Sequence, residues 1–169
     1  MTESELERYV GLYRKSVCTA ALYYVKDPSD ADDITQDVFF RLFMYDGEFE
    51  NDDHVKAWLL RCAVNRSKDL LRSHWYRFSE PLETVKERTS DSISDSGGRV
   101  LDILRKLGRK NRITLYMYYY EGYSSPEIAG ILGISERAVS SRLRRGRQQL
   151  KKLLEDERND TENGLQRLF

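Results

Sequence analysis

A polar stretch in the middle of the chain places the strongest limit on its fold. Residues 79–98 read SEPLETVKERTSDSISDSGG, with only Leu82, Val85 and Ile93 as large apolar residues. Such a composition cannot bury enough apolar surface to offset the entropy lost on ordering. We therefore expect a flexible linker there, dividing the 169-residue chain into two small domains.

Helical periodicity runs through both halves, whereas sustained period-two alternation, the signal of a strand, is nearly absent. The apolar spacing predicts helices over residues 4–26, 29–45, 53–77, 99–108, 110–121, 125–132 and 135–157. We predict an all-α protein of two small helical domains joined by a flexible linker. The N-terminal domain covers residues 1–78, the linker 79–98, the C-terminal domain 99–158 and a polar tail 159–169.

Composition argues against a membrane protein, a secreted protein, a metalloprotein and an enzyme. No apolar run approaches the roughly 18 residues that span a bilayer, and the first residues lack the apolar core of a secretory signal. Cys18 and Cys62 lack CxxC spacing, and His54 and His74 lack a partner at metal-ligand spacing. Paired carboxylates, a nucleophile–base pair and a phosphate-binding loop are also missing. We expect a cytoplasmic protein with no cofactor, no metal and no catalytic residues.

Charge is balanced over the whole chain but strongly segregated along it. The 28 basic residues match the 28 acidic ones. Residues 27–53 nevertheless carry a net charge of −9, residues 54–77 carry +5, and residues 136–152 carry +6. Blocks of opposite sign indicate separate surfaces with separate partners, although any one block could also be a solvated face.

The last basic block follows a helix-turn-helix pattern. In YSSPEIAGIL, Ser124 or Ser125 is placed to cap a short helix, and Glu127 can complete a capping box. Gly133 supplies the stop, and Ser135 caps a second, longer helix. A short helix, a glycine-containing turn and a longer helix are typical of DNA-binding helix-turn-helix units.

The second helix separates apolar from basic residues by angle. At about 100° per residue, its buried face contains Val139, Leu143, Gly146, Leu150, Leu153 and Leu154. Arg137, Ser140, Ser141, Arg144, Arg145, Arg147, Gln148, Lys151 and Lys152 lie on the other side. The absence of acids between Glu136 and Glu155 favours DNA over a solvated face. We assign DNA contacts to Arg137, Ser140, Ser141, Arg144, Arg145, Lys151 and Lys152.

A second basic stripe lies on the helix expected over residues 53–77. Arg61, Asn65, Lys68 and Arg72 fall within an arc of about 60°, and apolar residues fill most of the remaining circumference. Basic residues beside Trp58, with an amide able to bond base edges, suit single-stranded or opened DNA. A solvated face with snorkelled side chains is the alternative.

The acidic helix expected over residues 29–45 has a different outer face. Ser29 and Asp32 are placed to cap it, and its core stripe contains Ala31, Ile34, Val38 and Leu42. The reverse side displays Asp33, Gln36, Asp37 and Phe40. An aromatic side chain among carboxylates and an amide favours a protein-docking face.

The order of these parts resembles the extracytoplasmic-function (ECF) sigma factors of bacterial RNA polymerase. DADDITQDVFFRLF and AWLLRCAVNRSKDLLR carry the resemblance in the first half, and GYSSPEIAGILGISERAVSSRLRRGRQQL carries it in the second. The resemblance implies that the acidic helix docks on the clamp helices of core RNA polymerase's largest subunit. It also implies that the Trp58–Arg72 helix recognises and melts the −10 promoter element, and that the helix-turn-helix reads the −35 element. If the linker lets the free halves collapse together, an anti-sigma factor could trap that state.

Two other readings share part of this pattern. A stand-alone helix-turn-helix regulator explains the C-terminal half but gives no reason for the Phe40 face or the Arg61–Arg72 stripe. A tyrosine recombinase is suggested by HWYR at His74–Arg77 and by the later tyrosines, but that chemistry needs a larger domain with strands. At helical spacing we expect Leu115, Tyr118 and Tyr119 in the core rather than on a base-stacking surface.

Overall fold

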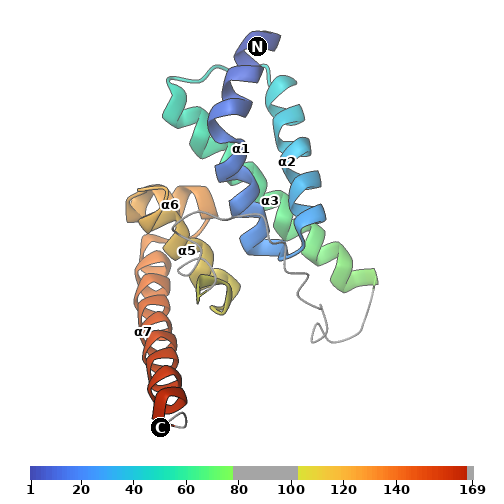
Figure 1. The fold of residues 1–169 in the computed structure, drawn as a ribbon. Helices are drawn as coiled ribbons and strands as arrows, with labels where there is room; N and C mark the ends of the chain where they lie inside the picture. The colour runs from blue at the N-terminus through green and yellow to red at the C-terminus, as the bar shows by residue number, and fades with distance from the viewer. Residues whose placement is uncertain (78–102, 167–169) are drawn as a thin grey trace. The chain divides into compact units, whose positions relative to one another are not determined.

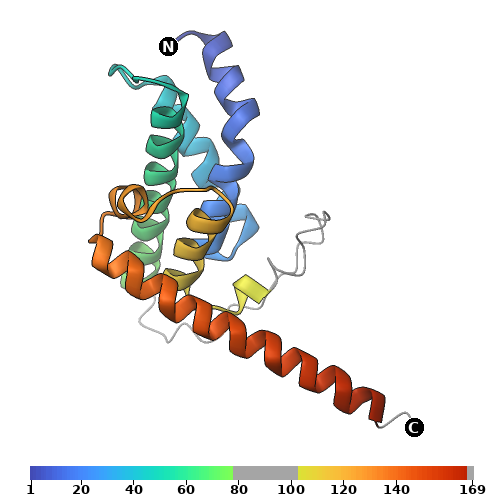
Figure 2. The same cartoon turned by 90° about the vertical axis from the view of Figure 1, so that its left-hand side faces the viewer.

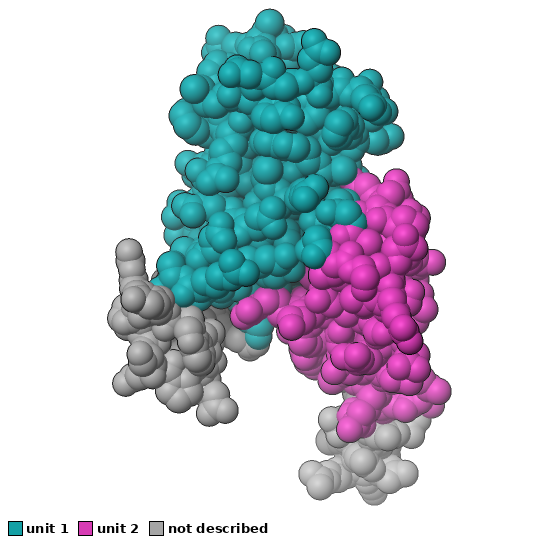
Figure 3. Space-filling model, turned by 180° about the vertical axis from the view of Figure 1, so that it is seen from behind, with its two compact units in different colours: residues 1–90, 130–133 teal, residues 91–129, 134–169 magenta. Residues whose placement is uncertain are grey.

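The computed structural model describes residues 1–77 and 103–166, so the predicted linker lies outside the described residues. The helices are α1 (Glu3–Val25), α2 (Pro28–Phe43), α3 (Asp52–Arg77), α5 (Arg109–Tyr119), α6 (Ser125–Leu132) and α7 (Glu136–Gln166). No strand occurs within these two ranges, which confirms the all-α prediction. No helix in the described part of the chain is both long and apolar enough to cross a membrane. Figure 3 colours two compact units, residues 1–90 with 130–133 and residues 91–129 with 134–169.

The first two helices begin and end at clear local signals. Thr2 and Glu5 form a capping box at the start of α1, where the Glu5 backbone N–H donates to Thr2 Oγ1 at 3.2 Å. The chain then leaves α1 through Lys26, whose φ of 62° is left-handed and whose N–H donates to the Leu22 carbonyl at 2.9 Å.

The cap of α2 differs from the expected one. Asp27, rather than Ser29 or Asp32, is the N-cap, and its carboxylate accepts hydrogen bonds from the Ser29 and Asp30 N–H groups at 2.8 and 3.2 Å. The reason is Pro28, which holds the residue before it in the extended region and fits the first helical position. The helix therefore begins one residue earlier than expected.

The core of the first unit lies between α1, α2 and α3. Figure 1 shows α1 beside α2, joined by a short turn, with α3 crossing both. Its buried residues are Val17 and Ala21 on α1, Ala31, Ile34, Val38, Phe39 and Leu42 on α2, and Val55, Leu59 and Ala63 on α3. The apolar stripe predicted for α2 is therefore confirmed. Burial of this stripe fixes which side of α2 and α3 faces outward.

The helix-turn-helix is built from α6, a turn at Gly133 and α7. Ser124 donates through its N–H and hydroxyl to Glu127 Oε2 at 2.8 and 2.6 Å, which lowers the pKa of that carboxyl. Gly133 has a φ of 66°, where only glycine is unstrained, and it ends α6. Ser135 then accepts a hydrogen bond from the Ala138 N–H at 3.2 Å at the start of α7. The turn at Gly133 and the Ser135 cap are confirmed, and Ser124 rather than Ser125 contacts Glu127 at the start of α6.

A glycine lets α5 and α7 approach closely. A Cβ added at Gly146 would lie 2.8 Å from Leu115 Cδ1, so the predicted packing role of this glycine is confirmed. Asn111 Nδ2 donates to Gln149 Oε1 at 2.9 Å one turn further along α7. Figure 2 shows α7 continuing well beyond α5, and it reaches Gln166 rather than residue 157. The segment after 157 contains no proline, and Lys151 and Glu155 form a helix-stabilising pair at 3.9 Å.

Candidate functional site

The outer face of α7 is basic and backed by a buried stripe. Arg137, Ser140, Arg144, Arg145, Lys151 and Lys152 are exposed, and Ser141 is half-buried. Val139 and Leu143 are buried behind them, at 0% and 4% exposure. Of the six residues predicted for the buried face, Leu154 is 42% exposed, because it lies beyond the part of α7 that packs on α5. The structure thus brings the predicted DNA residues onto one exposed surface.

This surface has the chemistry of a recognition helix. In a helix-turn-helix the first turns of the second helix enter the major groove, and later residues lie near phosphates. Arg137, Ser140 and Arg144 occupy those first turns, where arginine can bond guanine O6 and N7 together and serine suits either base type. Lys151 and Lys152 follow two turns later on the same helix.

Three of the four residues of the predicted stripe on α3 face outward. Arg61, Asn65 and Arg72 are exposed and Lys68 is half-buried. The rest of the helix surface is largely buried, with Leu59, Leu60, Ala63 and Val64 each at 0% exposure. Ser67 is also buried, and its hydroxyl donates to the Ala63 carbonyl at 2.7 Å, which spares the core an unpaired hydroxyl. The polar stripe is thus held on a helix whose other sides are fixed by packing.

The docking face predicted on α2 divides into free and paired side chains. Asp33 and Gln36 are exposed, and Phe40 is 64% exposed. Asp37 instead lies 3.0 Å from Arg66 Nε and 3.1 Å from Arg41 Nε through the same carboxylate oxygen, Oδ2. Arg66 is a residue that sequence analysis missed. Its ion pair ties the outer face of α2 to α3.

Apolar exposure continues past Phe40 at the end of α2. Phe43 is 42% exposed, Met44 62% and Tyr45 38%. The run FFRLFMY contains more large apolar residues than one buried stripe can hold, and this excess was the available signal for a larger surface. The apolar part of the α2 face is therefore wider than predicted.

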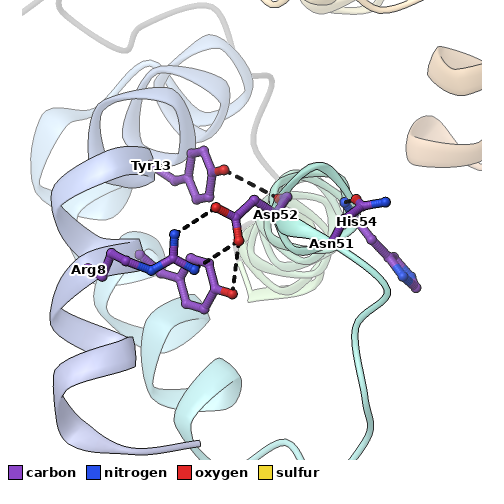
Figure 4. A network of polar contacts seen from close by, with 6 residues as sticks. Arg8, Tyr13, Asn51, Asp52 and His54 are labelled. Atoms are coloured by element: carbon purple, nitrogen blue, oxygen red, sulfur yellow. Dashed lines mark hydrogen bonds and ion pairs between the residues drawn. The ribbon is translucent and has the colours of Figure 1, made fainter.

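A polar network fixes the start of α3 against α1 (Figure 4). Arg8 donates to both carboxylate oxygens of Asp52, at 2.6 and 2.8 Å, and the Tyr9 hydroxyl donates to Oδ1 at 3.2 Å. The Tyr13 hydroxyl donates to the Asp52 carbonyl at 3.3 Å. The hydrogen bond from Arg8 holds the pKa of the Asp52 carboxyl below its ordinary value. Asp52 is thus one acid of the 27–53 block that is used internally.

An aromatic cluster joins the loop between α2 and α3 to the first turns of α3. Phe49 lies 5.0 Å from Tyr45, 5.8 Å from Trp58 and 5.4 Å from His54 between ring centroids. Tyr45 and Trp58 are 5.1 Å apart. These contacts brace the loop next to the exposed stripe of α3.

Two tyrosines of α5 are exposed, which corrects the expectation that they join the core. Leu115 is buried at 1% exposure, but Tyr118 is 37% and Tyr119 59% exposed. The buried side of α5 instead uses Ile113, Leu115 and Met117. Consecutive apolar residues in YMYYY cannot all face one side of a helix, so spacing alone did not identify the buried ones.

Two further groups of side chains, the thiols and the possible metal ligands, were predicted to have no site of their own. Burial raises the pKa values of Cys18 and Cys62, which keeps both thiols protonated and weakly reactive. Over residues 1–77 and 103–166, histidine, cysteine and carboxylate side chains nowhere gather in a group of three that could hold a metal ion.

Comparison with known proteins matches both halves of the chain. The family model described as Sigma-70 region 2 matches residues 9–77, and the model described as Sigma-70, region 4 matches residues 97–150. These ranges contain the exposed stripe of α3 and the helix-turn-helix. The two family models therefore cover the residues of both exposed surfaces described above.

Relatives that match most of the chain agree with these models. The RNA polymerase sigma factor NccH of Alcaligenes xylosoxydans xylosoxydans is 30% identical over 83% of this chain and 82% of its own length. The ECF RNA polymerase sigma factor SigM of Mycobacterium tuberculosis is 34% identical over 74% of this chain and 64% of its own. The solved complex of sigma factor RpoE with the anti-sigma factor NepR from Bartonella quintana has the same fold, with a TM-score of 0.73, 21% identity, and coverage of 89% of this chain and 97% of that one. The chain belongs to the sigma factors of bacterial RNA polymerase, in the extracytoplasmic-function group.

Proposed function

We propose that three exposed helix faces divide the work of this sigma factor, which directs promoter-specific initiation of transcription by core RNA polymerase. The α2 face docks on the polymerase, the α3 stripe engages the −10 element, and the α7 face reads the −35 element. The observation that carries the proposal is the exposed face of α7, which has no acid between Glu136 and Glu155 and is backed by buried Val139 and Leu143. The chemistry of RNA synthesis belongs to the polymerase.

Docking is assigned to Asp33, Gln36, Asp37 and Phe40, opposite the clamp helices of the polymerase's largest subunit. Phe40 supplies the apolar centre, because a phenylalanine 64% exposed gains most from leaving water on binding. Asp33 and Gln36 are exposed polar residues at the rim. Asp37, already paired with Arg41 and Arg66, contributes by holding the surface in shape.

The −10 element is assigned to Arg61, Asn65, Lys68 and Arg72. Asn65 can bond the edges of unpaired bases, and the three basic residues attract the strand's phosphates. The aromatic cluster of Tyr45, Phe49 and Trp58 braces the loop beside them. This arrangement favours a strand whose bases have left the duplex, since an amide and basic residues beside an aromatic side chain suit unpaired bases.

The −35 element is assigned to Arg137, Ser140, Ser141, Arg144 and Arg145 for base and nearby phosphate contacts, and to Lys151 and Lys152 for phosphates alone. Arginine paired with guanine discriminates against other bases by about 1–3 kcal/mol. Phosphate contacts add affinity without sequence preference and make binding depend on salt.

Two further elements complete the proposal. RpoE in the solved complex is bound to an anti-sigma factor, and we include such a partner for this chain. We also place its action in the cytoplasm, where polymerase and chromosome meet. The domain boundaries at residues 78 and 98 and the tail from residue 159 stay predictions.

The test is transcription in vitro with purified core polymerase and a library of promoter fragments. The wild-type chain should select promoters that share two elements. Phe40→Ala should require about tenfold more sigma factor for half-maximal transcription, because a buried phenylalanine contributes about 1.5–3 kcal/mol. Leu12→Ala is the matched control, since Leu12 is 54% exposed on α1 and lies outside the proposed face. Selection of no promoter by the wild type would refute the function, and equal effects of the two variants would refute the docking assignment.

A further inference from the structure

The strongest feature that the proposed function leaves unused is a contact between Arg147 and the exposed tyrosines of α5. Arg147 Nε donates to the Tyr119 hydroxyl at 2.8 Å. The Arg147 guanidinium carbon also lies 5.5 Å from the Tyr118 ring centroid and 5.6 Å from that of Tyr119. Both distances fall within the roughly 6 Å limit of a cation–π contact. Two helices thus hold one arginine in a fixed place.

The position of Arg147 on α7 relates it to the base-reading residues. Arg147 follows Ser140 by seven residues, so the two lie within about 20° on the helix circumference and about 10.5 Å apart along its axis. The major groove is about 12 Å wide. If Ser140 faces a base edge, a side chain about 10 Å along the same face lies at the wall of the groove, where the phosphates are.

The remaining hydrogen-bond donors of the pair fit an anion. Arginine has five N–H donors, and Arg147 uses the one on Nε, which leaves the four on its Nη atoms. The Tyr119 oxygen accepts from Arg147, so its own O–H is left to donate. Among the described residues no carboxylate pairs with Arg147, and both Arg147 and Tyr119 are exposed. An anion at this point would therefore meet a preorganised guanidinium and a phenol.

We propose that Tyr119 and Arg147 together form a phosphate-binding site for the promoter backbone at the edge of the −35 element. This inference rests on the proposed function, because it requires α7 to lie in the major groove. Tyr119 fixes the guanidinium before DNA arrives, which reduces the side-chain entropy that binding would otherwise cost. Tyr118 supports the arginine with its ring, and its hydroxyl has no part in the site.

The test uses holoenzyme assembled from the full chain and core polymerase, bound to a labelled promoter fragment across a salt series. Arg147→Ala should weaken binding about tenfold and reduce the slope of log affinity against log salt by about 0.9, for every −35 sequence alike. Tyr119→Phe should weaken binding about threefold with the slope unchanged, because the lost hydroxyl is uncharged. In the Arg147→Ala background, Tyr119→Phe should add much less, since the anion site is already lost.

Matched controls separate this site from a structural contact. Tyr118→Phe should bind like wild type, because it removes only a hydroxyl that the site does not use. On promoter fragments that are truncated so that they lack the −35 element, all of these variants should also match wild type. Arg147→Lys keeps the charge without the Nε–H donor, so it should retain the salt slope while losing affinity.

Four results would overturn the inference. If Arg147→Ala and Tyr119→Phe lower the melting temperature but leave DNA affinity and salt slope unchanged, the pair is only a brace between α5 and α7. If they weaken binding to core polymerase instead, the tyrosines contact protein. If Arg144→Ala changes −35 discrimination while both variants match wild type, this site is wrong and the proposed function stands. An Arg144→Ala variant that discriminates like wild type would instead remove the −35 assignment, and this inference with it.

Discussion

Gly146→Ala tests whether close approach of α5 and α7 shapes the second unit. The added Cβ would lie 2.8 Å from Leu115 Cδ1, 3.1 Å from Leu115 Cγ and 3.4 Å from Asn111 Cβ. Carbon atoms prefer about 3.5–4.0 Å, so the Leu115 side chain must move. Leu115 is 1% exposed, so it is enclosed by other side chains, and its Cγ is not a free end that can swing away.

Two opposing effects set the size of the change. Alanine is favoured over glycine inside a helix by about 1 kcal/mol. Overpacking a filled core typically costs about 1–3 kcal/mol. The net result should be a loss of about 1 kcal/mol in the free energy of unfolding of the second unit.

Gly130→Ala gives the matched control for the helical preference alone. Gly130 lies within α6, its φ is not left-handed, and a Cβ there would meet nothing within 4 Å. In this variant the free energy of unfolding should therefore rise by up to about 1 kcal/mol, which separates the two variants by up to about 2 kcal/mol.

Hydrogen exchange of the α5 amides across a urea series measures the relevant quantity. Because a two-domain chain need not unfold in one step, exchange of amides in residues 113–117 reports on the second unit by itself. Gly146→Ala should speed this exchange and Gly130→Ala should not. If Gly146→Ala protects these amides as well as Gly130→Ala does, the close contact with Leu115 carries no energetic weight and the packing argument fails.

The α3 stripe and the Arg8–Asp52 contact of the first unit give two further predictions. Asn65→Ala should slow promoter opening, which is seen as weaker permanganate reactivity at the −10 element. A pre-melted template should restore most of the opening. If the variant shows wild-type permanganate reactivity on duplex DNA, the α3 stripe is only a solvated face. The Arg8–Asp52 contact should lose its stabilising effect in acid, because a carboxyl with a lowered pKa stabilises the fold above its ordinary pKa of 3.8 and loses that effect as pH falls through the lowered value. Between pH 5 and pH 2 the melting temperature should therefore fall less steeply for Asp52→Asn than for wild type. Parallel curves of melting temperature against pH would contradict this.

The sequence was sufficient for the features that depend on local periodicity. Ile34, Val38 and Leu42 repeat at helical spacing and are all buried, and Gly133 with Ser135 marks the turn before α7 at the correct residues. These signals act within one helix or one turn. Each can be evaluated without knowing what packs against it.

Contacts between helices were beyond the same reasoning. Asp37 pairs with Arg66 across 29 positions, and Arg147 contacts Tyr119 across 28, and neither spacing belongs to a helical or strand period. The exposure of Tyr118 and Tyr119 follows from how α5 crosses α7 at Gly146, which a helical wheel of α5 alone does not contain. The cap of α2 was missed for a local reason, because Pro28 shifted the start of the helix.

Pairing within the fold also changes what the charge blocks mean. The 27–53 block carries a net charge of −9, yet Asp37 is held by Arg41 and Arg66, and Asp52 by Arg8. The docking face of α2 therefore depends less on charge than its sequence indicates, and more on Phe40 and the exposed residues that follow it. Within the described part of the chain, the basic residues of α7 have no comparable set of internal acids before Glu155. Salt should accordingly weaken promoter binding much more than polymerase binding, because counterion release acts on the phosphates that α7 meets and has little effect on burial of an aromatic ring.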